Sequence, residues 1–289
     1  MSDKDTKVDE VTGVETTGHS WDGIEELNNP LPRWWLWTLY ATIVWAVGYT
    51  IAYPAWPMIS GATTGLLGYS TRGEVAREIA AHNALNDGLV ADLLAADLAG
   101  LAPSDDLHRY AVSRGESVFR AQCSQCHGSG AAGAKGYPNL LDDDWLWGGD
   151  VDNIVLTVSH GVRNETDGDA RYSQMPAFGE ILEDGEINDL VEYVTSLSAP
   201  QFDADMAARG ETLFAENCAS CHGEMAEGNR DMGAPNLGDA IWLYGGDRET
   251  LDYTVRYARY GVMPAWGQRI SEADVRAVSV YVHGLGGGE

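Results

Sequence analysis

The sequence is poor in basic residues. It holds 18 lysines and arginines against 44 aspartates and glutamates, so its formal net charge is −26. Proteins that bind nucleic acid need cations that neutralise phosphates, and this composition therefore excludes nucleic acid as a partner. A negative surface attracts basic protein partners and speeds their encounter, and it serves solubility equally well.

Cysteine is also scarce, with 4 residues in a chain of 289. The cysteines form two close pairs, Cys123 with Cys126 and Cys218 with Cys221, and a histidine follows each pair. This spacing argues against two structural disulfides. The alternation of apolar and polar residues that is typical of strands is missing from the chain, so we predict an all-α fold.

One stretch of the chain lacks charge altogether. Residues 34–53 contain no charged side chain, and 20 helical residues rise about 30 Å, the thickness of a bilayer's hydrocarbon core. Aromatic residues lie at both ends of the stretch, as in the belts of membrane proteins: Trp34, Trp35, Trp37, Tyr53 and Trp56. We predict an uncleaved transmembrane helix at 33–55, which follows an N-terminal segment at 1–32.

The distribution of basic residues orients this span. Lys4, Lys7 and Arg33 precede it, and no basic residue follows until Arg72. Positively charged flanks remain in the cytoplasm, so we expect a cytoplasmic N-terminus and an exported remainder. A helical stalk is predicted at 56–103, with a capping box at Thr71 and a break at 86–88.

Two later segments repeat each other in the same order. The stretch RGESVFRAQCSQCHGSG from Arg114 matches RGETLFAENCASCHGEM from Arg209. Two shorter motifs also recur, PNL at Pro138 and Pro235 and MPA at Met175 and Met263. We predict two tandem domains, at 104–200 and 201–289, with an exposed insert at 163–174 in the first.

Capping residues mark the helices within these repeats. We expect one helix to begin near residues 104–106 and five others to begin at Asp150, Asp184, Asp203, Asp247 and Ser271.

The Cys-x-x-Cys-His motif is typical of covalent haem c attachment. Cysteines three residues apart on a helical turn share a face, so both thiols reach the two vinyl groups of one haem edge. The histidine then presents its imidazole to the iron. Cys123, Cys126 and His127 are thus predicted to bind one haem c, and the set Cys218, Cys221 and His222 a second.

Other uses of paired cysteines fit less well. A zinc ribbon places its two cysteine pairs about 15–20 residues apart in the sequence. The two pairs of this chain are separated by a far longer stretch, from Cys126 to Cys218. A thioredoxin-like motif does not require the histidine and lies near a βαβ pattern, which is absent here.

Methionines supply the expected sixth iron ligands. Met175 and Met263 recur in equivalent Met-Pro-Ala-aromatic-Gly loops, and a proline after the methionine stiffens such a loop. The alternative is that both are core methionines. Met232 is a weaker candidate because Lys135 stands in its place in the first repeat. His160, matched with Tyr260, is an alternative ligand in the first repeat.

The repeated residues resemble the class I cytochrome c fold. In that family a glycine and an aromatic residue of the first helix cross an aromatic residue of the last. The resemblance implies that Gly115 and Phe119 face Tyr193, and that Gly210 and Phe214 face Tyr281. It also implies that the carbonyls of Pro138 and Pro235 accept from the axial histidines, that Leu140 and Leu237 pack on the haems, and that haem is bound in the periplasm.

The stretch from Thr16 to Pro57 resembles the N-terminal signature of the dihaem subunit III of cbb3-type cytochrome c oxidases. Anchor, stalk and two cytochrome domains occur in that family in this order. The resemblance implies a single-pass protein of the bacterial inner membrane beside a catalytic haem–copper subunit and a monohaem cytochrome c subunit. It would take electrons from a donor cytochrome c, expected to be basic, and would not be catalytic itself.

Three other functions remain open from the residues alone. A free-standing membrane-anchored dihaem carrier would have the same chemistry without a fixed partner. A cytochrome subunit of a periplasmic dehydrogenase would take electrons from a substrate-oxidising partner. A dihaem peroxidase would need an exchangeable ligand at one iron.

Overall fold

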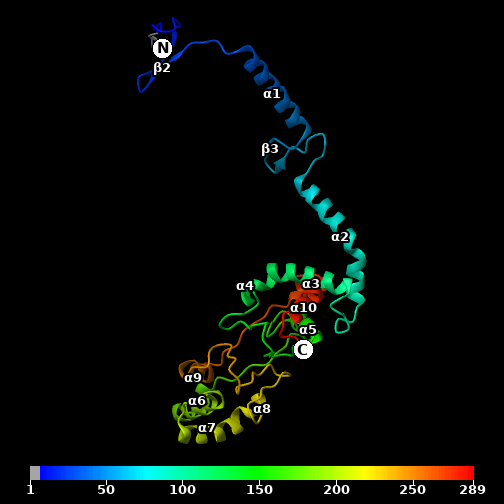
Figure 1. Cartoon of the computed structure of the whole chain (residues 1–289), viewed down its shortest axis with the longest axis vertical. Helices are drawn as coiled ribbons and strands as arrows, with labels where there is room; N and C mark the ends of the chain where they lie inside the picture. Colours follow the sequence, from blue (N-terminus) through cyan, green and yellow to red (C-terminus); the bar gives the residue numbers. More distant parts are fainter. Residues whose placement is uncertain (1–6) are drawn as a thin grey trace. The chain divides into compact units, whose positions relative to one another are not determined.

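The computed structural model describes residues 7–289 (Figure 1). Lys4, which contributes to the predicted orientation, lies outside the described residues. Contacts divide the chain into an N-terminal part that ends at Leu85 and a C-terminal part from Asn86 to Glu289. The described chain is mostly helical, as predicted, and also holds a few short strands that were not predicted.

A hairpin and a long apolar helix lie in the N-terminal part. Strands β1 (Thr16–Trp21) and β2 (Ile24–Leu27) pair antiparallel. Helix α1 (Arg33–Ala52) follows, and the chain itself buries none of its residues. Among the described residues, α1 is the one helix that is long and apolar enough to cross a membrane.

The span predicted at 33–55 begins at the observed residue but extends too far. Helix α1 ends at Ala52, and Tyr53 is extended with ψ 162°. Pro54 explains this end, because the residue before a proline disfavours the helical conformation.

The chain then returns to the end of α1. Strands β3 (Pro57–Met58) and β4 (Gly61–Ala62) form a short hairpin. Leu66 and Leu67 donate their backbone N–H groups to the last carbonyls of α1, each at 3.0 Å. These bonds satisfy carbonyl groups that a helix end otherwise leaves unpaired.

Helix α2 (Thr71–Ala95) corresponds to the predicted stalk. The capping residue is Ser70, whose hydroxyl accepts from the Gly73 N–H at 3.2 Å, rather than the predicted Thr71. The break predicted at 86–88 is wrong because the helix continues through Gly88. A glycine inside a helix costs only about 1 kcal/mol, which a long helix can absorb.

The C-terminal part holds the remaining helices. In chain order they are α3 (Asp106–Val118), the π-helical turn η1 (Phe119–Cys123), α4 (Ser124–His127), α5 (Val151–His160), the 3-10 turn η2 (Phe178–Glu180), α6 (Asp184–Ser198), α7 (Ala204–Asn217), α8 (Ala219–His222), α9 (Arg248–Tyr257), the 3-10 turn η3 (Trp266–Gln268) and α10 (Glu272–His283).

Most predicted caps of these helices are confirmed. Four predicted residues accept hydrogen bonds from first-turn N–H groups: Asp150, Asp203, Asp247 and Ser271. Helix α3 begins at Asp106, within the predicted range, but its N-cap residue Asp105 makes no side-chain capping bond. Helix α6 is capped by Glu183 through a box with Glu186, and the predicted cap Asp184 is its first residue.

The long helices pack across the two repeats. Helix α3 packs against α10, and α6 packs against α7 (Figure 1). A Cβ on Gly115 would lie 2.2 Å from the Ala277 carbonyl oxygen, so a glycine permits the α3–α10 crossing. A Cβ on Gly210 would likewise lie 2.1 Å from the carbonyl oxygen of Asp189 at the α6–α7 crossing.

Aromatic side chains and ion pairs flank both crossings. The Phe119 and Tyr281 rings lie 5.5 Å apart, and those of Tyr193 and Phe214 lie 5.2 Å apart. One crossing carries the ion pair Arg114–Asp274, with 2.8 Å between nitrogen and oxygen, and the other carries Arg209–Asp189 at 2.6 Å.

The 3-10 turns also pack against helices of the other repeat. Turn η3 contacts α5, and turn η2 contacts α9. We therefore define unit A as α3, η1, α4, α5, η3 and α10, and unit B as η2, α6, α7, α8 and α9. Each unit combines segments from both repeats of the sequence.

This packing corrects two predictions. The repeats at 104–200 and 201–289 do not each form a separate packed unit, and the aromatic partners are the reverse of those expected: Phe119 with Tyr281 and Phe214 with Tyr193. The short link between α6 and α7 offers a physical reason. Short connections favour antiparallel packing of consecutive helices, so α6 pairs with the helix that follows it.

The two connecting segments meet at Val162 and Met263. Their backbones form an antiparallel bridge, with the Val162 N–H donating to the Met263 carbonyl at 3.1 Å and the reverse bond at 3.0 Å. Gly161 has φ +75°, and a Cβ there would lie 2.3 Å from the Met263 carbonyl oxygen. The first repeat thus fixes the backbone of the second repeat's methionine loop.

Candidate haem-attachment sites

The first attachment motif lies where the α3 helical run ends. Cys123 closes the π-helical turn η1, and Cys126 and His127 lie in α4. Cys123 is half-buried, Cys126 is exposed, and neither is in a disulfide. Burial, and next the neighbouring Cys126, raises the pKa of Cys123 to about 11, so this thiol is protonated at neutral pH.

The second motif has the same construction. Helix α7 ends at Asn217, Cys218 follows as its cap, and α8 carries Cys221 and His222. Burial, and next Cys221, raises the pKa of Cys218 to about 11. In both units a helix thus ends on the pair of thiols.

A proline carbonyl holds each histidine, as the cytochrome c resemblance implied. His127 Nδ1 lies 3.0 Å from the Pro138 carbonyl oxygen, and His222 Nδ1 lies 3.0 Å from that of Pro235. A carbonyl can only accept, so Nδ1 donates and Nε2 keeps a free lone pair. Burial lowers the pKa of both histidines and the proline bonds oppose this shift. A neutral imidazole with a free Nε2 is the form that binds a metal.

Matching backbone bonds shape the loop after each histidine. In unit A the Leu140 N–H donates to the Ala131 carbonyl at 2.8 Å, and in unit B the Leu237 N–H donates to Ala226 at 2.8 Å. Leu140 packs on the same apolar core as Cys123, and Leu237 on the same core as Cys218. Each leucine thus packs on the core of its own attachment motif, and the contact of Leu140 and Leu237 with a haem face stays a prediction.

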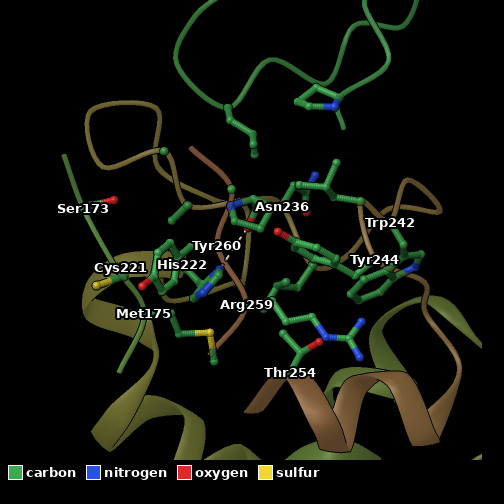
Figure 2. Close-up of a pocket in the computed structure, with 18 of the residues that line it drawn as sticks. Ser173, Met175, Cys221, His222, Asn236, Trp242, Tyr244, Thr254, Arg259 and Tyr260 are labelled. Carbon is green, nitrogen blue, oxygen red and sulfur yellow. Dashed lines mark hydrogen bonds between the residues drawn. The ribbon is translucent and has the colours of Figure 1, made fainter. Parts of the chain in front are cut away.

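The methionine loops are exchanged between the repeats. Met263 packs on the core of unit A, which also includes Cys123 and Leu140. Met175 lines a cavity in unit B together with His222 (Figure 2). Met263 therefore lies with unit A and Met175 with His222, whereas each repeat was expected to place its methionine beside its own histidine.

The cavity of unit B has a volume of about 880 Å³. Its lining includes the chemistry that haem c requires: the thiols of Cys218 and Cys221, the His222 imidazole and the Met175 thioether. Apolar and aromatic side chains complete it, among them Leu190, Val194, Phe214, Leu237 and Trp242. Donor set and apolar walls both fit a large, flat porphyrin.

Unit A supplies part of the wall of this cavity. The lining includes Lys135, Pro138 and Asn139, which belong to the loop that holds His127. The two attachment sites therefore share one loop between them.

Two alternative ligands can now be placed. Met232 also lines the cavity of unit B, but it precedes Pro235 in the loop that holds His222. Met175 comes from a separate segment, as a ligand opposite the histidine requires.

His160 ends α5 and corresponds to Tyr257, which ends α9, rather than to Tyr260.

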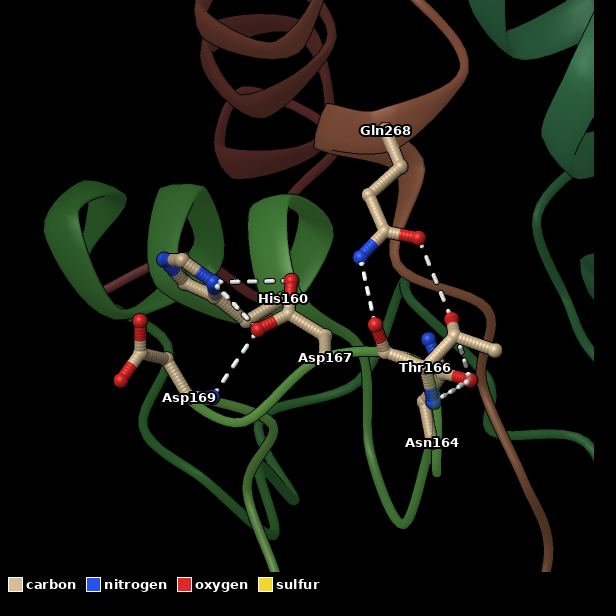
Figure 3. Close-up of polar contacts among 6 residues, drawn as sticks. All are labelled: His160, Asn164, Thr166, Asp167, Asp169 and Gln268. Atoms are coloured by element: carbon tan, nitrogen blue, oxygen red, sulfur yellow. Dashed lines mark hydrogen bonds and ion pairs between the residues drawn. The ribbon is translucent and has the colours of Figure 1, made fainter.

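The insert at 163–174 forms hydrogen bonds with His160 and with the turn η3. His160 Nδ1 lies 3.2 Å from the Asp167 carboxylate, and atoms of Asp169 lie nearby (Figure 3). Gln268 Nε2 donates to the Thr166 carbonyl at 2.9 Å. Half of the twelve residues of the insert are exposed and none is buried, in agreement with its predicted place at the surface, and it leads from unit A to Met175.

Three residues of the site were not among those predicted from the sequence: Arg163, Tyr244 and Arg259. All three line the cavity of unit B, and the backbone of Arg163 has φ +51°. Neither arginine lies in a motif common to both repeats, so only the three-dimensional arrangement places them at the site.

Two units with this geometry, each with a Cys-x-x-Cys-His motif, a proline-bound histidine and a methionine loop, define a c-type cytochrome with two attachment sites. Residues 111–194 and 205–282 match the family model described as cytochrome c oxidase, cbb3-type, subunit III. Residues 13–60 match the N-terminal domain of cytochrome oxidase-cbb3, FixP.

Similar proteins match over nearly the whole chain. The cbb3-type cytochrome c oxidase subunit CcoP of Cereibacter sphaeroides is 61% identical over 95% of both chains. The FixP subunits of Sinorhizobium medicae and Rhizobium meliloti are 52% and 51% identical over 100% of both chains. The chain belongs to the family of cbb3-type cytochrome c oxidase subunit III, whose members are named CcoP or FixP.

Proposed function

We propose that the chain binds two haem c groups and conducts electrons within a cbb3-type oxidase. Cys123 and Cys126 would hold one porphyrin, with His127 and Met263 as axial ligands. The second would be held by Cys218 and Cys221, with His222 and Met175 as axial ligands. The bound groups supply reversible one-electron exchange.

The observation that carries this proposal is that each unit brings an imidazole and a thioether to one attachment site. In unit B a proline-bound imidazole and a thioether line one cavity. In unit A His127 is bound in the same way, and Met263 packs on the core of Cys123. An iron held by both side chains would have no open position for oxygen or peroxide, so neither unit would be a catalytic centre.

The other residues of the pocket tune and protect this exchange. The carbonyls of Pro138 and Pro235 fix the histidine tautomer and raise the basicity of Nε2. Leu140 and Leu237 keep water from the porphyrin faces. Because the His127 loop also lines the cavity of unit B, electrons would have a short path between the two sites.

The partners follow from family membership and charge. We propose that the chain accepts electrons from a donor cytochrome c with a basic surface and passes them to the catalytic haem–copper subunit, beside a monohaem cytochrome c subunit. The net charge of −26 supports a basic donor, because opposite charges steer encounter.

The membrane arrangement rests on α1. We propose that α1 anchors the chain in the bacterial inner membrane with residues 1–32 in the cytoplasm and both haem units in the periplasm. Lys7 and Arg33 precede the span and no basic residue lies between α1 and Arg72, which supports this orientation.

Purification of the native complex tests the function. We expect this chain to carry covalent haem on a denaturing gel and to co-purify with a high-spin haem and copper. Met175→Leu should create a reduced haem that binds carbon monoxide, whereas Met232→Leu, a matched control, should not. Absence of covalent haem from the chain would refute the proposal.

A further inference from the structure

Arg163 is one of the arginines that form no ion pair in the described part of this acidic protein. Acids exceed bases by 44 to 18, and eight arginines in the described chain form ion pairs with aspartate or glutamate. Within residues 7–289, no carboxylate pairs with Arg163. Six other arginines share this lack, and Arg163 differs from them in the contacts of its side chain: Arg33, Arg72, Arg171, Arg259, Arg269 and Arg276.

The side chain of Arg163 joins the two methionine segments. Its Nε donates to the Gly261 carbonyl at 2.8 Å, and Nη1 donates to the Ser173 carbonyl at 2.8 Å. Gly261 lies two residues before Met263, and Ser173 lies two residues before Met175. One guanidinium thus holds the approach to both proposed axial ligands.

Arg163 is also half-buried and lines the cavity of unit B. Burial lowers its pKa, and nearby tyrosines, Tyr244 first among them, oppose that shift only in part. Even partial burial disfavours the charge of a cation, and a nearby anion would offset that cost.

A porphyrin of the haem c type carries two propionate carboxylates. We propose that Arg163, a residue of the first repeat, is the counter-charge for a propionate of the haem bound in the cavity of unit B. It thereby raises the reduction potential of that haem while its hydrogen bonds position both methionine loops. The proposal rests on the function proposed above, because it requires haem in this cavity.

Arg259 is the alternative partner, but its contacts differ. Its guanidinium carbon lies 4.3 Å from the Tyr253 ring centroid and 5.4 Å from that of Tyr244. Its charge is therefore already placed over aromatic faces. Arg163 has no such ring contact in the described chain and only two neutral carbonyls as acceptors.

The reduction potential of the unit B haem depends on the charge of Arg163 and can therefore test the proposal. A cation near the haem favours the reduced state, whose net charge is lower by one. Arg163→Gln should therefore lower the reduction equilibrium constant of the unit B haem by about tenfold, or about 59 mV for one electron. Arg163→Lys keeps the charge and should retain most of the potential. Arg109→Gln, which removes an exposed arginine paired with Asp106, is the control of equal charge change.

The experiment is a spectroelectrochemical titration of the purified complex. The unit B component is assigned first with Met175→His, which replaces thioether by imidazole and lowers the potential of that haem. Haem staining checks that every variant carries covalent haem. If Arg163→Gln titrates like Arg109→Gln, or if Arg163→Lys shifts as far as Arg163→Gln, the charge assignment is overturned. Missing haem in the unsubstituted chain would instead overturn the proposed function.

Discussion

Gly115 of the first repeat lies against Ala277 of the second, with no room for a side chain between the two helices. A Cβ on Gly115 would lie 2.2 Å from the Ala277 carbonyl oxygen and 2.7 Å from the Tyr281 Cβ. Backbone atoms cannot rotate away as a flexible side chain can. This contact joins α3 to α10 and defines unit A.

Replacement of Gly115 by alanine should destabilise unit A. Forcing a methyl group into a packed crossing costs about 1–3 kcal/mol, and each kcal/mol lowers the melting temperature by roughly 2–4 °C for a domain of this size. Thermal scans of the purified chain measure the change. Gly130→Ala is the control, because a Cβ on Gly130 would meet nothing within 4 Å. Equal melting temperatures of the two variants would contradict the crossing.

The ion pairs offer a test of which helices pair. Arg114 and Asp274 are half-buried at the α3–α10 crossing. Arg114→Asp should cost about 1–2 kcal/mol of unfolding free energy, because a partly buried pair lies between exposed and fully buried ones.

A second substitution identifies the partner of Arg114. Asp274→Arg should restore most of the stability of Arg114→Asp, whereas Asp189→Arg, the equivalent residue of the other unit, should not. Denaturant unfolding of the double variants measures this. Rescue by Asp189→Arg alone would mean that each repeat folds on itself.

The cap of α5 predicts a pH dependence. Hydrogen bonds from Asn153, its side chain first, lower the pKa of Asp150. A carboxylate whose pKa is lower in the folded state adds stability above its unfolded pKa of about 3.9 and loses it as pH falls through the folded pKa. Asp150→Ala should therefore cost about 1 kcal/mol at pH 7, with a smaller difference below pH ~4.

Asp152→Ala serves as the control for that experiment, because Asp152 is an exposed residue of the same first turn and caps nothing. A stability difference between the parent chain and Asp150→Ala that stays constant down to pH ~3 would contradict the assigned role of the carboxylate.

Local features were predictable because each depends on a few neighbouring residues. The spacing of Cys123, Cys126 and His127 is set by one helical turn, and the Asp150 cap requires only its own first turn. The end of α1 depends on Pro54, which disfavours the helical conformation at Tyr53, rather than on the apolar character from which the span was predicted. The break in α2 was predicted from Asn86, Asp87 and Gly88, although a glycine within a long helix is tolerated.

The exchange of helices could not be predicted from the residues at the crossings. Tyr193 and Tyr281 occupy equivalent positions in the two repeats, so either could pack on Phe119. The same holds for Met175 and Met263. The choice depends on the connections, such as the short link between α6 and α7, and on the Val162–Met263 bridge. Arg163 was missed for the same reason, since its contacts join segments that are distant in sequence.

The most direct test uses a chain with a single haem. In the Cys218→Ala/Cys221→Ala protein, the remaining haem is attached to Cys123 and Cys126. Met263→Leu in this background should open the iron, which then binds carbon monoxide when reduced, and Met175→Leu should leave it low-spin and closed. If Met175→Leu opens the iron and Met263→Leu does not, each repeat completes its own site and the exchanged arrangement is wrong.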